Sequence, residues 1–416
     1  MHVSKPVPNN KARKAVDKVS SPLQKFFALE ASGGILLFVA AVAAMIMANS
    51  SALSEFYNSL ITTPVVIGVG TFALEKNLLL LVNDGLMAIF FFVVGLEIKR
   101  EILVGELSSI KKASFSIFAA IGGMAIPALI YFSMNGGSES ASGWGIPMAT
   151  DIAFALGVLT LFGKRAPLPL KIFLLALAII DDLGAILIIA IFYSSNISMT
   201  FLGGAFVTLG LLFFLNHVGF RNIGLGIVFG LITWFFFLKS GIHATIAGVL
   251  LAFITPAYGV REDGEIDKEG PLFIDQHIHS LHSWVAFVIM PIFAFFNAGV
   301  GLAGVDIGVA LTSNVSLGII LGLLIGKPVG VFLFAYGATK LGWSHLPQSL
   351  NWKQVFAVGL LAGIGFTMSL FINSLAFTNP QLVTYAKLGI ITASAIAMVL
   401  GAGILHMSLP ALRKET

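Results

Sequence analysis

The sequence predicts an all-α polytopic membrane protein with twelve transmembrane helices, on the basis of three observations. Hydrophobic residues make up 57% of the 416-residue chain. Charged residues make up only 11%, whereas soluble proteins carry about 25%, so most of the surface must face lipid. Twelve apolar runs approach the roughly 20 residues that a helix needs to cross a hydrocarbon core. These features exclude a soluble enzyme and a nucleic-acid-binding module.

The twelve runs give the expected spans in order, and the seventh and eighth are the least secure because they are short. A β-barrel would instead show alternating segments of about ten residues, which the sequence lacks. The chain has no cysteine, which excludes disulfides and thiol catalysis. The runs lie at residues 31–50, 77–98, 113–134, 144–162, 169–193, 199–215, 222–238, 240–256, 284–301, 316–338, 354–376 and 383–408.

The placement of positive charge predicts the orientation. With the N-terminus inside, the inner segments hold 20 of the 24 Lys and Arg, and the outer loops hold only Lys76, Lys239 and Lys387. By the positive-inside rule both termini are expected in the cytoplasm. No short apolar region with a cleavage site follows the basic N-terminus, so the first run is expected to be a span and not a signal peptide.

The same reading divides the chain into a twelve-span domain and three accessory segments. We expect a cytoplasmic N-terminal tail over 1–28, the domain over 29–410 and a cytoplasmic tail over 411–416. A cytoplasmic connector is expected at about 257–283. Its acidic stretch at 261–268 (REDGEIDK) is expected to be a solvated loop between two bundles of helices.

Five ionisable residues are expected near the bilayer centre, and each is a functional-site hypothesis because such a group costs at least ~2.5–3.5 kcal/mol there. They are Asp84, Asp151, Asp181, Asp182 and Lys327. Asp181 and Asp182 lie about halfway along the fifth run, near the membrane midplane. Adjacent helical residues point about 100° apart, so these two carboxylates have different surroundings. Lys327 is the only midplane cation that can pair with one of them.

This set of charges favours ion binding over a purely structural role. Four carboxylates against one lysine leave surplus negative charge, and buried uncompensated carboxylates bind a proton or another cation. Oxygen ligands without cysteine suit Na⁺ or Li⁺ better than a transition metal. Two ions that compete for one site, open alternately to either side, are sufficient for exchange. A structural ion pair between Asp181 and Lys327 is the alternative reading.

Two runs are interrupted by glycines at matching places. Gly143 to Pro147 precede Thr150 in one run, and Gly363 and Gly365 interrupt the other. The units 113–193 and 316–408 each hold three runs with the interrupted one in the middle, and they start on opposite sides of the membrane, as inverted repeats require. Broken helices are tolerated in a membrane where they line a cavity or bind an ion. Glycines that only allow close helix packing are the alternative.

Seven stretches together resemble the NhaA-type sodium/proton antiporter family along nearly the whole chain. They occur in order at 83–88 (NDGLMA), 95–101 (GLEIKRE), 149–157 (ATDIAFALG), 180–185 (IDDLGA), 241–245 (GIHAT), 293–299 (FAFFNAG) and 326–328 (GKP). The resemblance implies two interrupted helices that cross at the ion site, and alternating access between two sub-bundles. It also implies more than one proton exchanged per sodium.

The resemblance assigns roles to the buried residues. It implies that Asp182 is the principal ion-binding carboxylate and that Asp151 and Thr150 are its neighbours, so that Na⁺ or Li⁺ binds at these three. Asp181 is implied to pair with Lys327, and we expect that pair to break when Na⁺ binds. Whether Lys327 carries a transported proton or is only a counter-ion is left open by the sequence. Asp84 is expected to be an accessory residue within the membrane.

Candidates for a response to pH lie nearer the membrane surface. Glu97, Arg100 and Glu101 are spaced i, i+3 and i+4, and the resemblance places them in a cytoplasmic funnel where pH is sensed. A surface ion-pair cluster of small energy is the alternative. His243 and His279 are further candidates because histidine titrates near neutrality, although packing or interfacial roles are the alternative.

The region of His279 also contains a departure from the family pattern. His277, His279 and His282 precede the ninth run, and a metal site is disfavoured there because no carboxylate is close enough to fix its geometry. Family members can carry an acidic residue just before the second of these histidines, where this chain has Ile278. The departure affects the expected pH profile and not the ion site.

The sequence therefore predicts a secondary active, electrogenic, pH-regulated Na⁺(Li⁺)/H⁺ antiporter of the bacterial inner membrane, serving pH homeostasis and salt tolerance. It is expected to be a transporter and not an enzyme, and to need no cofactor. Its expected surroundings are membrane lipid, and no nucleic-acid partner is expected. A homodimer is left open. A sodium-coupled organic-anion symporter of related architecture is the alternative. An intramembrane aspartyl protease is disfavoured because Asp151 and Asp181 do not follow Tyr and Gly-x-Gly-Asp is absent. A passive channel is disfavoured because deep, charge-coupled sites slow ion release.

Overall fold

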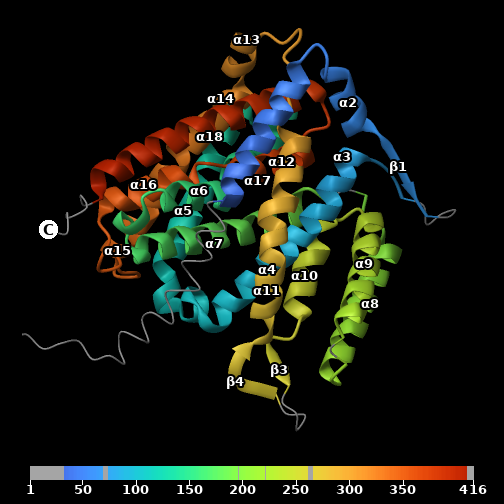
Figure 1. Ribbon diagram of the computed structural model, residues 1–416. Helices are drawn as coiled ribbons and strands as arrows, with labels where there is room; N and C mark the ends of the chain where they lie inside the picture. The colour runs from blue at the N-terminus through green and yellow to red at the C-terminus, as the bar shows by residue number, and fades with distance from the viewer. Residues whose placement is uncertain (1–31, 69–73, 195, 221, 261–265, 410–416) are drawn as a thin grey trace, which may run out of the picture.

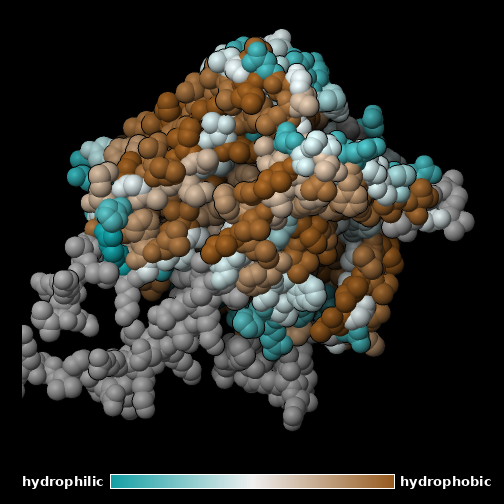
Figure 2. All heavy atoms as spheres, turned by 45° about the horizontal axis from the view of Figure 1, so that its top comes forward, coloured by the Kyte–Doolittle hydropathy of each residue, from teal (hydrophilic) through white to brown (hydrophobic). Residues whose placement is uncertain are grey.

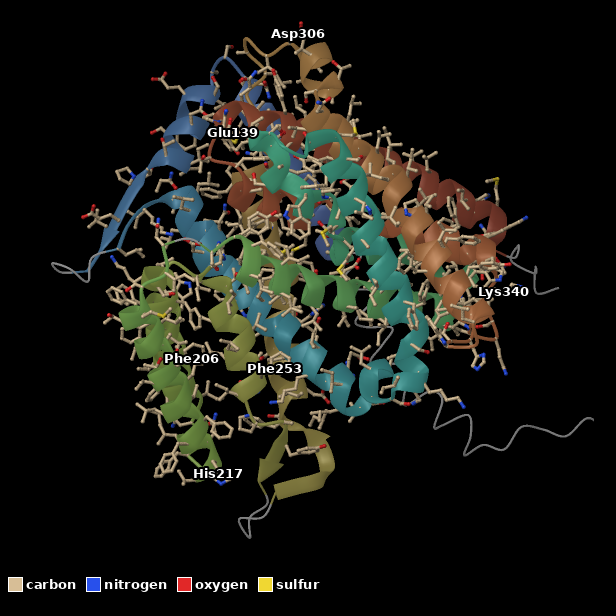
Figure 3. The ribbon with its side chains drawn as sticks, turned by 180° about the vertical axis from the view of Figure 1, so that it is seen from behind. Glu139, Phe206, His217, Phe253, Asp306 and Lys340 are labelled. Carbon is tan, nitrogen blue, oxygen red and sulfur yellow. The ribbon has the colours of Figure 1, made fainter. Side chains whose placement is uncertain are left out.

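The computed structural model describes residues 32–68, 74–194, 196–220, 222–260 and 266–409, which form an assembly composed mainly of helices (Figure 1). The predicted tails at 1–28 and 411–416 and residues 261–265 of the acidic stretch lie outside the described residues. Hydrophobic side chains cover most of the face shown in Figure 2, and hydrophilic ones gather at its edges. Glu139 and Asp306 lie at one end of the molecule and His217 at the other (Figure 3).

The described chain contains ten helices that are long and apolar enough to cross a membrane, or eleven spans if one bent pair of helices counts as a span. The predicted run at 240–256 corresponds to α10 (Thr245–Ile254), which has ten residues. Such a helix is about 15 Å long, half of a ~30 Å hydrocarbon core. The polytopic all-α class therefore holds, whereas the number twelve stays a prediction.

The first part of the chain forms seven of these spans. The helix Ser32–Asn49, called the first helix below, is followed by the short α2 (Ser54–Thr62). The other six spans comprise α3 (Leu78–Leu81), a π-helical turn (Val82–Leu86) and α4 (Met87–Val104) as one span, then α5 (Ile110–Asn135), a 3₁₀ segment (Glu139–Met148) with α6 (Ile152–Thr160), α7 (Leu168–Phe192), α8 (Met199–His217) and α9 (Ile223–Ser240).

The second part of the chain forms the remaining spans. They comprise α11 (Phe273–Trp284), a π-helical turn (Val285–Ile289) and α12 (Met290–Ala298) as one span, then α14 (Asn314–Leu321), a π-helical turn (Gly322–Gly326) and α15 (Lys327–Lys340) as the next, the bent pair α16 (Trp352–Ala362) and α17 (Phe366–Ala376), and α18 (Pro380–Ser408). The short α13 (Ile307–Thr312) precedes α14.

Two of the π-helical turns have a local cause in proline. A proline removes one backbone donor, and its ring crowds the carbonyl four residues earlier. Pro291 and Pro328 each follow a π-helical turn closely, and the wider turn absorbs this conflict without breaking the span. The third π-helical turn contains no proline and instead carries Asn83 and Asp84. Turns of this kind are frequent at functional sites.

Two antiparallel hairpins complete the described part of the fold. One pairs β1 (Pro64–Ile67) with β2 (Leu74–Asn77), and the other pairs β3 (Tyr258–Val260) with β4 (Ile266–Leu272). The second hairpin lies where a solvated loop was predicted. The helix α11 begins at Phe273, which lies inside the predicted connector. Its first turns carry polar residues, so the apolar run that predicted the ninth span did not include them.

The C-terminal end of α12 is held by side chains from three other helices. Tyr57 Oη donates to the Phe295 carbonyl at 2.7 Å, and Asn49 Nδ2 donates to the Val300 carbonyl at 2.8 Å. Lys387, which was counted with the outer loops although it falls near the start of the run 383–408, belongs to α18 and donates to the Gly299 carbonyl at 3.3 Å. These donors satisfy carbonyls that a helix end leaves unpaired. Burial raises the pKa of Tyr57 to about 12, so its hydroxyl stays a donor near neutral pH.

The two interrupted spans meet at their breaks. The 3₁₀ segment ends at Met148, and α6 begins at Ile152. The axes of α16 and α17 differ by 46°. The Asp151 N–H donates to the Ile364 carbonyl at 2.6 Å, which joins the two breaks directly. A Cβ at Gly363 would lie 2.5 Å from the Leu323 carbonyl oxygen, so only glycine allows this close approach.

Candidate functional site

The crossing of the broken helices brings the five principal site candidates into one buried region. Asp181 and Asp182 come from α7, and Thr150 and Asp151 precede α6. Lys327 is the first residue of α15. All five are at most 3% exposed. Side chains from distant parts of the sequence therefore form a single site, which we call the crossing site.

Lys327 is held between a carboxylate and a helix end. Its Nζ lies 2.6 Å from Asp181 Oδ2 and also donates to the carbonyl of Met148. Met148 ends the 3₁₀ segment, so its carbonyl is available where the broken span stops. The two residues that the sequence predicted to pair are thus in direct contact, and the lysine charge is committed to Asp181.

Thr150 adds a second hydrogen bond to the same carboxylate oxygen. Its Oγ1 lies 2.7 Å from Asp181 Oδ2 and 2.9 Å from the carbonyl of Ala362, the last residue of α16. A hydroxyl carries one proton, so these are alternative acceptors. Within the described residues the other Asp181 oxygen, Oδ1, has no hydrogen-bond partner. Asp181 therefore has one well-satisfied oxygen and one that remains available.

Asp151 joins the N-termini of both broken helices. It is the N-cap of α6, where its Oδ1 accepts from the Phe154 N–H at 3.1 Å. Its Oδ2 accepts from the Thr367 N–H at 3.0 Å and from the Thr367 hydroxyl. Helix N-termini carry unsatisfied donors and partial positive charge, so one carboxylate stabilises both. Sequence reasoning did not assign Thr367, although it lies two residues after Gly365 of the second glycine break.

Asp182 differs from its neighbours because it accepts no hydrogen bond from any residue that the structure describes. It is 3% exposed, and Asp181, Asp151 and Glu97 all repel its charge while Lys327 attracts it. A buried charge without a partner is costly. Asp182 is therefore the carboxylate of the crossing site that is best placed to accept a proton or a cation.

Asp84 lies in a second buried cluster together with a candidate that was predicted separately. Lys76, from β2, forms a salt bridge with Asp84 Oδ2, and His243 Nε2 lies 3.3 Å from Asp84 Oδ1. Trp234 Nε1 donates to the Asp84 backbone carbonyl at 3.0 Å. Lys76, predicted in an outer loop, therefore reaches a carboxylate that the sequence assigned to a span.

Two of the three pH-response candidates on α4 contact α11. Arg100 Nε lies 2.9 Å from Asp275 Oδ1, and Glu97 Oε1 lies 3.6 Å from His282 Nδ1. Glu101 Oε2 accepts from the Glu106 N–H at 2.8 Å. Sequence reasoning did not pair Glu97 with His282 because the two lie in different spans.

The predicted candidate His279 and its neighbour Ile278 have different environments. His279 is exposed and makes no hydrogen bond to any residue that the structure describes. Ile278 is 9% exposed and packs in an apolar cluster with Leu96, Ala252 and Ile274. The position where family members can carry an acidic residue is thus part of the packing between α4, α10 and α11 in this chain.

These features define a class of protein before any comparison is made. Broken helices that cross beside a buried surplus of carboxylates are the construction of a secondary ion transporter. Among the described residues no group of three or more His, Asp or Glu is arranged to hold a metal ion. A cation at this site would therefore use carboxylate oxygens together with hydroxyl or backbone oxygens.

Comparison with known proteins identifies the family. The family model described as Na⁺/H⁺ antiporter 1 matches residues 24–405. The chain is 52% identical over 390 residues to the Na(+)/H(+) antiporter NhaA of Escherichia coli O1:K1 / APEC, an alignment that covers 93% of this chain and 98% of that protein. Proteins of the same name from Shigella dysenteriae serotype 1 (strain Sd197) and Shigella boydii serotype 4 (strain Sb227) are 51% identical with the same coverage. The chain belongs to the Na⁺/H⁺ antiporter 1 family.

Proposed function

We propose that this protein is a secondary active antiporter that exports Na⁺ in exchange for H⁺ across the bacterial inner membrane. Family membership supports the activity, and the free carboxylate of Asp182 is the single observation that carries the site. Asp182 is buried beside three other carboxylates while the only lysine of the site is committed to Asp181. Such a group is stable when it holds either a proton or a cation, and the two compete.

The neighbours of Asp182 supply the remaining cation ligands in this proposal. Thr150 and Asp151 offer oxygen atoms, which suit Na⁺ and Li⁺. Asp151 is hydrogen-bonded to two helix N-termini, so it contributes to ion binding only if the crossing rearranges. Ion binding is thereby coupled to the conformation of the broken helices, as alternating access requires.

Exchange of more than one proton per Na⁺ requires a second proton-binding group besides Asp182. The Asp181–Lys327 pair supports two readings. Either Na⁺ breaks the pair and Lys327 releases a proton, or Lys327 stays a counter-ion and another carboxylate is the second carrier. In both cases the titration belongs to the coupled group and not to one residue.

The orientation and pH regulation complete the proposal. The distribution of Lys and Arg supports cytoplasmic termini, which places the facing sides of α4 and α11 near the cytoplasmic end. Glu97 and His282 face each other there, and we assign the pH response to this contact because histidine is the side chain that most often changes charge near neutral pH. The 3.6 Å separation of these side chains supports this assignment. The homodimer stays a prediction.

Proton movement driven by cations tests the proposed function. In acid-loaded vesicles of defined sidedness, addition of Na⁺ or Li⁺ is expected to drive proton efflux through the wild-type protein. Asp182→Asn should abolish this efflux because the amide cannot exchange a proton for a cation. K⁺ is run alongside to define selectivity.

A matched control separates the loss of the site from a general effect of the substitution. Asp306→Asn makes the same chemical change at the N-cap of α13, where asparagine caps as well as aspartate, and it should retain exchange. Wild-type-like exchange by Asp182→Asn would overturn the site assignment. If no cation moves protons through the wild-type protein, sodium-driven uptake of an organic anion becomes the function to test.

A further inference from the structure

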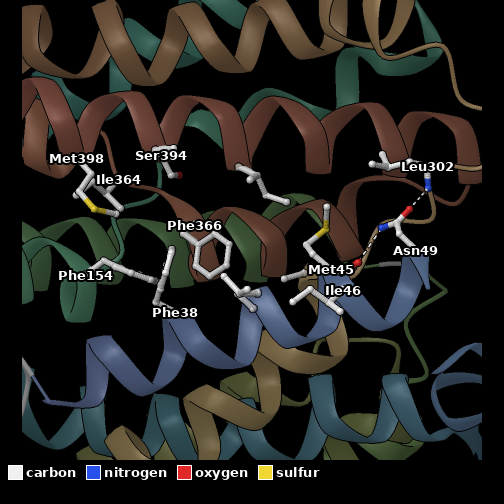
Figure 4. Close-up of a pocket in the computed structure, with 15 residues that line it drawn as sticks. Phe38, Met45, Ile46, Asn49, Phe154, Leu302, Ile364, Phe366, Ser394 and Met398 are labelled. Atoms are coloured by element: carbon white, nitrogen blue, oxygen red, sulfur yellow. Dashed lines mark hydrogen bonds between the residues drawn. The ribbon is translucent and has the colours of Figure 1, made fainter. Parts of the chain in front are cut away.

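An elongated apolar pocket of about 450 Å³ lies between the first helix and α18, outside the crossing site (Figure 4). Residues along the first helix, from Phe38 to Asn49, form one wall, and residues of α18, including Ser394 and Met398, form another. None of the residues that line it is ionisable. Pockets of this size with such a lining suit an apolar ligand.

The pocket opens toward the membrane and not toward water. Phe38 and Ile46 are 53% and 61% exposed, and both lie on a helix long and apolar enough to span a bilayer. A water molecule would need two to four polar partners, which this lining cannot offer. The Asn49 amide is already engaged with the carbonyls of Met45 and Val300 and with the Leu302 N–H. The surrounding lipid is therefore the source of the occupant.

The length of the pocket identifies which part of a lipid it fits. Phe38 and Asn49 are eleven residues apart on one helix, a span of about 16 Å at 1.5 Å per residue. One leaflet of a bilayer contributes about half of the ~30 Å hydrocarbon core. The pocket therefore runs through the depth of one leaflet, from the polar end of the first helix to the middle of the membrane. We propose that it binds one acyl chain of a phospholipid from the leaflet at the Asn49 end.

The deep end of the pocket is formed by the residues that build the helix crossing. Phe154 and Ile364 line the pocket, and their backbones bind Asp151 directly through the Phe154 N–H and the Ile364 carbonyl. The rings of Phe154 and Phe366 pack edge to face with centroids 5.3 Å apart. The end of a bound chain contacts this aromatic pair, so the chain supports the crossing from the lipid side through dispersion contacts.

Photolabelling of the full-length protein tests the proposal. The probe is a phosphatidylethanolamine with a diazirine at the end of one acyl chain, reconstituted with the protein in lipid vesicles and mapped by mass spectrometry after irradiation. Labelling is expected at the deep end of the pocket, around Phe154 and Phe366. Ala395→Phe places a ring in the pocket and should abolish that labelling. Val399→Phe, on the 71% exposed face of the same helix, should retain it.

Two further variants keep the result interpretable. Met45→Trp fills the pocket from the opposite wall and should also lose the labelling. Loss in both variants could not be attributed to misfolding of Ala395→Phe alone. The Ser394 hydroxyl is buried and has no hydrogen-bond partner among the described residues. A bound hydrocarbon chain would not provide one. Ser394→Ala should therefore label as the wild type does. Loss of labelling in Ser394→Ala would show that binding depends on a polar contact with the hydroxyl, which an acyl chain cannot make. Undiminished labelling in both filled variants would show that the chain lies elsewhere. Either result overturns the proposal.

Discussion

At the scale of single residues, the crossing site holds more negative than positive charge in a buried region. Lys327 is 0% exposed, and its charge is balanced by Asp181 and by the Met148 carbonyl. Such pairs contribute little net stability compared with a well-packed apolar pair, but breaking one is costly because a buried charge is left alone. The lysine is therefore tied to the stability of the protein, and under the proposed function also to transport.

This balance makes a residue-level prediction for Lys327→Ala. The variant leaves Asp181 without its counter-ion, and removal of one partner of a buried pair costs about 3–5 kcal/mol. We expect a lower thermal unfolding temperature in detergent as well as impaired exchange. The double variant Asp181→Asn/Lys327→Met removes both charges and should recover most of the stability but not the exchange. An unchanged unfolding temperature in Lys327→Ala would argue against the buried pair.

At the scale of elements, the two broken helices depend on one carboxylate. Asp151 accepts hydrogen bonds from the first turn of α6 and from the first turn of α17, and its own N–H binds the Ile364 carbonyl. The breaks expose backbone groups that no water can satisfy in a membrane. The crossing is stable because each break satisfies groups that the other leaves open.

Substitution of Asp151 tests this element-level role. Loss of an N-cap costs about 0.5–2 kcal/mol, and Asp151→Ala loses the caps of two helices, so its thermal stability in detergent should fall clearly below that of the wild type. Asp151→Asn keeps one oxygen acceptor and should fall less. Asp306→Ala, which removes the N-cap of the short α13, is the control and should have a small effect. Equal stability of Asp151→Ala and the wild type would refute the double cap.

The elements also show what the sequence could and could not predict. Apolar runs located the spans because burial in lipid leaves a signal in composition, and the cost of intramembrane charge singled out Asp151, Asp181, Asp182 and Lys327. The start of α11 at Phe273 was missed because polar residues at a helix end interrupt an apolar run. Contacts between distant segments, such as Glu97 with His282 or Asp84 with His243, leave no local pattern and require the folded structure.

At the scale of the whole molecule, three clusters of charged side chains link distant parts of the chain. The crossing site joins α7, α15 and the broken helices, and the Asp84 cluster joins the α3–α4 span to β2 and to His243. The ion pairs of Arg100 and Glu97 join α4 to α11. Ion pairs between buried groups are costly to break, so each cluster has only a few stable arrangements. These contacts are therefore where a change between two global states must be controlled.

An exchanger that moves more than one proton for each Na⁺ transfers net charge in every cycle, and this leads to a prediction for the molecule as a whole. One net charge crossing a potential of 100 mV changes the driving force by about 2.3 kcal/mol, or roughly 50-fold in the Na⁺ gradient held at equilibrium. In vesicles of defined sidedness, a K⁺ diffusion potential with the cytoplasmic side negative should drive Na⁺ out of the cytoplasmic compartment without any pH gradient. Asp182→Asn in the same vesicles controls for leak. If exchange is active but the final Na⁺ gradient does not change with the membrane potential, the stoichiometry is one proton per Na⁺. The mechanism would then need no second proton-binding group besides Asp182.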